Sequence, residues 1–129
     1  MAKFKFTAEF ELKASPKVLF PYLSSASGLQ QWFAAKVNMR GSQSYDFLWD
    51  GESHPAKQTV LRVNKASRFD FQEEGEVRDL NYVEFKIEQS ELTQTTFLKV
   101  SDYSTNDDTA ELEELWEGLI HKLKEVAGC

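Results

Sequence analysis

Apolar and polar residues alternate at the start of the chain. In "KFKFTAEFELK" every second position from Phe4 to Leu12 is apolar, and the positions between them are polar. A period of two is typical of a strand with one buried face. The sequence therefore predicts a strand over residues 3–13.

The spacing then becomes helical. In "ASPKVLFPYLSS" Ser15 is a suitable N-cap, and Pro21 inside the pattern predicts a short or kinked helix. We expect Gly28 to let the chain turn into a second short helix, "LQQWFA", at residues 29–34.

The period returns to two from Lys36. Alternating stretches up to about residue 103 predict a meander of about six or seven antiparallel strands. Asp50-Gly51 is a hairpin turn signal. In the strand that follows this turn, the alternation places Leu61 and Val63 on one face.

The last part of the chain, residues 106–129, predicts one long amphipathic helix. Asp108 and Glu111 resemble a capping box, and Gly128 is a helix terminator. Apolar residues recur at three- and four-residue spacing between the two ends. Gly118 interrupts the helix at a cost of about 1 kcal/mol relative to Ala, and we expect it to permit the close approach of another element or a ligand.

Composition narrows the classes of function. The 129 residues suit one domain, and the net charge of -6 argues against nucleic-acid binding and against anionic membranes. No apolar stretch approaches a membrane span, so membrane insertion is not expected. The single cysteine, Cys129, permits no internal disulfide, which favours a reducing, cytoplasmic setting.

Four stretches, taken in their order, resemble a known family: "SPKVLFPYLSSASGLQQWFAAKVN", "YDFLWDG", "TQTTFLKVSD" and "LWEGLIHKLKEV". They are similar to START-like domains of the SRPBCC superfamily, and in particular to the group of homologues of the heat-shock chaperone ATPase activator. The resemblance implies a single START-like domain over residues 1–129. It also implies an α+β helix-grip fold, with a curved antiparallel sheet, two short helices after the first strand and one long C-terminal helix.

Catalytic and metal-binding patterns are not found. His54, His121 and Cys129 share no ligand spacing, so we predict no metal site and no cofactor. Nucleophile and phosphate-loop motifs are absent from the sequence. The acidic stretches at 73–79 and 107–114 are typical of solvated turns and helix starts. We therefore assign no catalytic residue and favour a protein that is not an enzyme.

The aromatic residues provide the candidate binding site. We expect Trp32 to support the fold and Phe33 to control access to a cavity between the sheet and the long helix. Arg62, Tyr82 or Tyr103 would supply a polar contact if its face turns inward. The alternative is that the wall residues are plain core. The candidate ligand-binding residues are Phe33, Trp49, Phe69, Phe85, Leu98, Trp116 and Ile120.

Three hypotheses of function remain open. The first is a non-catalytic module that binds a small hydrophobic or amphipathic ligand, such as a lipid. The second, implied by the resemblance, is a protein-interaction domain that docks on a chaperone. The third is a cyclase-type enzyme, which would need His54, Arg62 or Tyr82 in one cavity. We expect a monomer or a weak dimer formed through the edge strand at 37–41.

Overall fold

The structure is a computed structural model that describes residues 3–71 and 80–128. The predicted charged turn at 73–79 and the terminal Cys129 lie outside the described residues. Seven strands and three helices follow one another in the described part of the chain. In order they are β1 (Phe4–Leu12), α1 (Pro16–Ser24), α2 (Ala26–Leu29), β2 (Lys36–Met39), β3 (Ser44–Trp49), β4 (Glu52–Arg62), β5 (Ala66–Phe71), β6 (Tyr82–Gln89), β7 (Thr96–Ser104) and α3 (Thr109–Ala127).

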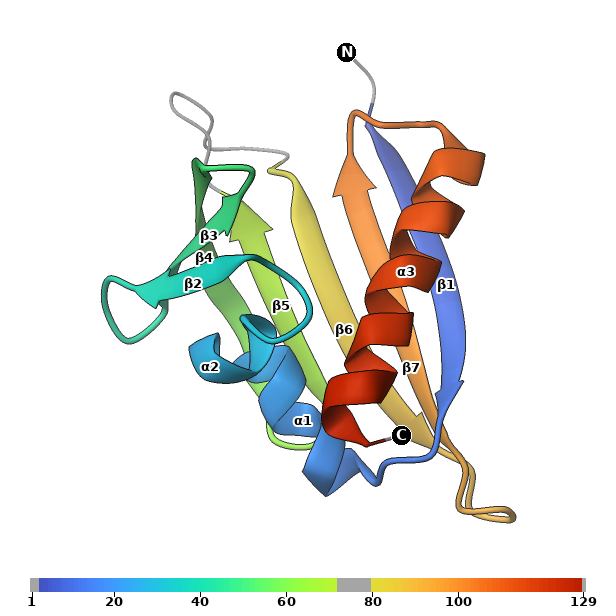
Figure 1. The fold of residues 1–129 in the computed structure, drawn as a ribbon. Coiled ribbons are helices and arrows are strands. Elements are labelled where there is room, and N and C mark those ends of the chain that lie inside the picture. The colour runs from blue at the N-terminus through green and yellow to red at the C-terminus, as the bar shows by residue number, and fades with distance from the viewer. Residues whose placement is uncertain (1–2, 72–79, 129) are drawn as a thin grey trace.

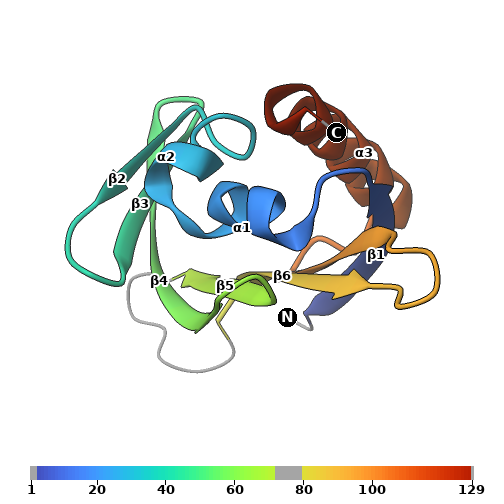
Figure 2. The ribbon, with the colours of Figure 1, turned by 90° about the horizontal axis from the view of Figure 1, so that it is seen from below.

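The strands form one antiparallel sheet in the order β1-β7-β6-β5-β4-β3-β2. The chain is a meander from β2 to β7, and β1 joins it by pairing along its whole length with β7. The sheet curves, and all three helices lie on its concave side (Figures 1 and 2). This arrangement confirms the predicted α+β helix-grip fold.

The turn between β3 and β4 has the predicted backbone conformation, and β4 contains an irregularity. Asp50 and Gly51 have φ angles of 51° and 79°, as the predicted tight turn requires. The register of β4 then shifts between Gln58 and Val60, as at a β-bulge. Leu61 is exposed after this shift, and the alternation in the second half of β4 does not mark a buried face.

The two short helices differ in part from the prediction. Ser15 caps α1, and the helix continues through Pro21 and ends three residues later. The second helix comes earlier than the predicted 29–34, because Ser25 caps it and it ends at Leu29. Gly28 therefore lies inside α2 and is not the turn between the helices.

The function of Gly28 is close packing. A Cβ atom placed there would lie 2.1 Å from the carbonyl oxygen of Pro21 and 2.7 Å from the Cα of Tyr22. Any other residue would push α2 away from α1, so the sequence places glycine where the two backbones meet.

The long helix α3 agrees with the prediction at both ends. The Asp108 carboxylate accepts a hydrogen bond from the Glu111 amide at 3.1 Å, and Gly128 ends the helix with a φ of 74°. The expectation that Gly118 permits the close approach of another element was wrong, because this residue is exposed and a Cβ atom there would contact nothing within 4 Å. The Tyr22 hydroxyl donates to the carbonyl of Val126 at 3.1 Å and joins α1 to the end of α3.

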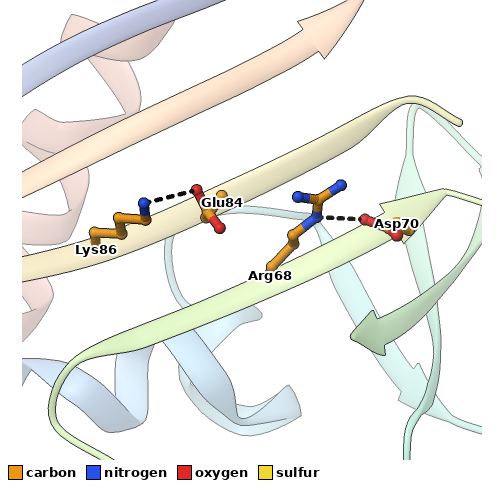
Figure 3. Close-up of polar contacts among 4 residues, drawn as sticks. All are labelled: Arg68, Asp70, Glu84 and Lys86. Carbon is orange, nitrogen blue, oxygen red and sulfur yellow. Dashed lines mark hydrogen bonds and ion pairs between the residues drawn. The ribbon is translucent and has the colours of Figure 1, made fainter. Parts of the chain in front are cut away.

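The convex face of the sheet carries charged side chains, and none of the described helices covers it. Arg68 and Asp70 on β5 form a 2.8 Å ion pair, and Lys86 and Glu84 on β6 lie 3.6 Å apart (Figure 3). The Arg68 guanidinium lies 3.8 Å from the centre of the Tyr82 ring. This face suits contact with water, and the apolar interior lies wholly on the other side.

Candidate ligand-binding site

A cavity of about 610 Å³ lies on the concave side of the sheet. Its walls come from α3, the segment after α2, the β3–β4 turn, the end of β5, the start of β6 and the end of β7 (Figure 1). Its larger apolar side chains are Trp32, Phe33, Trp49, Phe71, Leu115, Trp116 and Leu119.

The cavity exists because the helices cover the sheet unevenly. α1 packs on β5 and β6, while α3 packs on β1 and α1. Tyr82 and Val83 at the start of β6 line the cavity together with Trp116 of α3, and residues 32–35 complete the wall.

Phe33 is the centre of the aromatic cluster that forms this wall. Its ring centroid lies 5.2 Å from that of Trp49, 5.5 Å from that of Trp32 and 6.0 Å from that of Trp116. The Trp49 indole N–H donates to the carbonyl of Phe33 at 2.8 Å. With the ring and the backbone of Phe33 both held, the wall is formed before any ligand arrives.

Trp32 joins this wall to the helices. Its indole N–H donates to the carbonyl of Tyr22 at 2.7 Å, so the partner expected for this group is present. The side chain is buried and also contacts the Phe85 ring edge-on. Trp32 therefore supports the fold and lines the cavity at once.

A partly buried carboxylate lines this apolar space. Asp102 on β7 accepts a hydrogen bond from the Trp116 indole N–H at 2.9 Å. Burial raises the pKa of Asp102, and the bond from Trp116 opposes that rise. The remaining lining residues with polar or charged side chains are Asp50, Asn81, Tyr82, Tyr103, Ser104 and Lys122.

Sequence reasoning missed Asp102, although a signal was present. The alternation that places Leu98 and Val100 on the inner face of β7 continues to residue 102. A strand periodicity followed to its end would have put this acid on the same face as the core.

The seven predicted ligand-binding residues divide into two groups. Phe33, Trp49 and Trp116 line the cavity. The others are at most 2% exposed and are absent from its lining, so they belong to the packed core: Phe69, Phe85, Leu98 and Ile120.

The predicted polar contacts and the cyclase residues are not brought together. Arg62 and His54 are absent from the cavity lining. Tyr82 and Tyr103 contribute to the lining, but their rings stack on each other at 5.1 Å and Tyr82 contacts Arg68 on the convex face.

Within residues 3–71 and 80–128, the structure contains no group of three or more His, Cys, Asp or Glu residues that would suit a metal ion. Among the described helices, none has the length and apolar character needed to cross a membrane.

The chain is similar to a known domain family over its whole length. The family model for the START-like superfamily domain matches residues 1–129. Comparison with curated proteins gives no match.

Solved structures share the fold. The Aha1 dimer from Colwellia psychrerythraea is similar with a TM-score of 0.76 at 21% identity, and the match covers 96% of each chain. A Bacteroides fragilis protein has a TM-score of 0.66 at 30% identity, covering 98% of this chain and 92% of that one. A Mesorhizobium loti protein has a TM-score of 0.74 at 14% identity, covering 95% of each.

Proposed function

This chain belongs to the START-like superfamily, and from that premise we propose that it is a non-catalytic binding protein for a small hydrophobic or amphipathic ligand. The superfamily generally binds hydrophobic ligands or mediates interactions. The observation that carries the proposal is the cavity of about 610 Å³ with its preformed aromatic wall. Ligand pockets typically measure about 300–1,000 Å³ and are mainly apolar, with a few polar groups that fix orientation.

The chain provides its own reporter for a binding test. All three of its tryptophans line the cavity: Trp32, Trp49 and Trp116. A ligand that enters changes the surroundings of every indole, so intrinsic fluorescence should respond. Titration with the neutral probe N-phenyl-1-naphthylamine should give saturable binding at one site per chain.

A matched pair of variants tests whether the probe occupies this cavity. Leu115 is half-exposed and lines the cavity, whereas Leu92 is 97% exposed and is absent from the lining. Leu115→Glu places a charge beside the apolar ligand and should weaken probe binding by about tenfold, while Leu92→Glu should leave it unchanged. Equal effects of the two substitutions, or no saturable binding to the folded wild-type protein, would contradict the proposal.

Docking on a chaperone is the second candidate, and the likeness to the Aha1 dimer over nearly the full length of both chains favours it. Its test is the ATPase rate of a heat-shock chaperone from the same source, with and without this protein. A rate that stays unchanged at saturating protein would count against it.

The short edge strand β2, with Met39 half-exposed, is our proposal for a weak dimer contact.

A further inference from the structure

We infer that the cavity selects a hydrophobic amine, whose ammonium group binds the carboxylate of Asp102 while its apolar part lies among the aromatic rings. This inference rests on the proposed ligand-binding function and specifies the class of ligand. It follows from which hydrogen-bonding groups of the wall are already used and which are not.

The indole donors of the wall are occupied. The N–H groups of Trp32 and Trp49 donate to the backbone carbonyls of Tyr22 and Phe33. The N–H of Trp116 donates to Asp102. An anionic or carbonyl-bearing head group would therefore find none of these three donors available.

Acceptors are in excess at the junction of β6 and β7. An ionised carboxylate offers about four lone-pair sites, and the Trp116 bond uses one of those on Asp102. Within residues 3–71 and 80–128, the buried Oδ1 atom of Asn81 has no hydrogen-bond partner. Asp102 is paired with Val83, and Asn81 precedes Val83 by two positions, so both acceptors belong to the cavity end of these strands.

The charge balance also favours a cation. Burial disfavours the ionised form of Asp102 and so raises its pKa, a penalty that a bound ammonium group would offset. The faces of tryptophan and phenylalanine rings attract cations, so the rings of the wall would add to the attraction. The other charged groups of the lining are Asp50 and Lys122, and both are exposed to solvent at its rim.

The test compares head groups on one tail. Octylamine, 1-octanol and octanoate share an alkyl chain and differ in charge, and each would displace N-phenyl-1-naphthylamine from the wild-type protein at pH 7. We expect octylamine to bind about tenfold more tightly than octanol, because a charge-assisted hydrogen bond is about twice as strong as a neutral one. Octanoate should bind most weakly, because its charge repels that of Asp102.

Two variants locate the effect. Asp102→Asn keeps an oxygen that can accept from the Trp116 indole and removes only the charge, so the preference for octylamine over octanol should disappear while octanol still binds. Asp107→Asn removes an exposed carboxylate that lies outside the cavity lining and should leave the preference intact. Circular dichroism and thermal unfolding confirm that each variant is folded before it is compared.

The outcomes separate the two proposals. If none of the three compounds displaces the probe and the probe itself does not bind, the ligand-binding function fails. If octanol or octanoate binds as tightly as octylamine, or if Asp102→Asn retains the preference for the amine, the ligand-binding function stands and the inference about the amine is overturned.

Discussion

The same substitution, Gly to Ala, should have opposite effects at two positions of this protein. At Gly28 the added Cβ would lie 2.1 Å from the Pro21 oxygen and 2.7 Å from the Tyr22 Cα, both backbone atoms that cannot rotate away. The two helices must separate, and overpacking of this kind costs about 1–3 kcal/mol. Because the contact is with backbone at 2.1 Å, the upper end of this range applies. The better helix propensity of Ala returns about 1 kcal/mol at most, and we expect a net loss of about 2 kcal/mol in the free energy of unfolding.

At Gly118 the added methyl group meets nothing. The residue is exposed in the middle of α3, and no atom lies within 4 Å of the new Cβ. Only the helix propensity changes, so Gly118→Ala should stabilise the protein by about 0.5–1 kcal/mol.

Urea unfolding followed by tryptophan fluorescence measures both effects. With an m-value of about 1.5 kcal/mol/M, Gly28→Ala should lower the midpoint by more than about 1 M, and Gly118→Ala should raise it by about 0.5 M. A Gly28→Ala midpoint at or above that of the wild type would refute the argument that the α1–α2 contact requires glycine. A loss of stability in Gly118→Ala would show that α3 is packed against another element at that point.

Three further predictions follow from buried polar contacts. Because burial raises the pKa of Asp102, the folded state holds its proton to higher pH than the unfolded state, so the stability that this group contributes is present at low pH and lost as the pH rises through the folded pKa. In urea titrations, the unfolding free energy of Asp102→Asn, relative to that of the wild type, should therefore rise between about pH 3 and pH 7. A difference between the two proteins that does not change with pH would contradict the raised pKa. Gln58 donates to Ser67 and to the Ser24 carbonyl, so Gln58→Leu should destabilise the protein by about 2 kcal/mol in the same assay, and an unchanged midpoint would show that this network contributes nothing. Trp32→Phe removes the indole donor to the Tyr22 carbonyl and leaves a small void, so the midpoint of thermal unfolding should fall by about 8 °C. A decrease of less than about 2 °C would mean that another donor replaces the indole.

The sequence predicted the sheet and the long helix because each has a clear period. The strands alternate without interruption in β1 and β6, and α3 has a cap at each end. The second helix was predicted too late in the chain, because Gly28 was interpreted as a turn. The structure shows that a glycine is needed there for the close contact between α1 and α2. That contact joins Gly28 to Pro21, and no local pattern in the sequence reveals it.

The candidate site could be predicted only in part. The pattern shows that Phe85 and Trp116 both face inward, but it does not show which part of the sheet each helix covers. That coverage leaves Trp116 at the cavity and puts Phe85 in the core. Asp102 could have been found from the alternation in β7, whereas the absence of Arg62 and His54 from the lining depends on the path of β4 and the three-dimensional fold.

The pairing of β1 with β7 has a consequence for how the protein is made. The earliest partner of the first strand is Thr96, so at about 5–20 residues per second the ribosome needs several seconds after finishing β1 to produce it. During that interval Phe4, Phe6 and Phe10 have no sheet to join, and the growing chain presents an aromatic strand with a free edge. Contacts between such distant parts of a chain also form slowly. The newly made protein should therefore depend on a holding chaperone, and its yield should fall most steeply in cells where such chaperones are depleted.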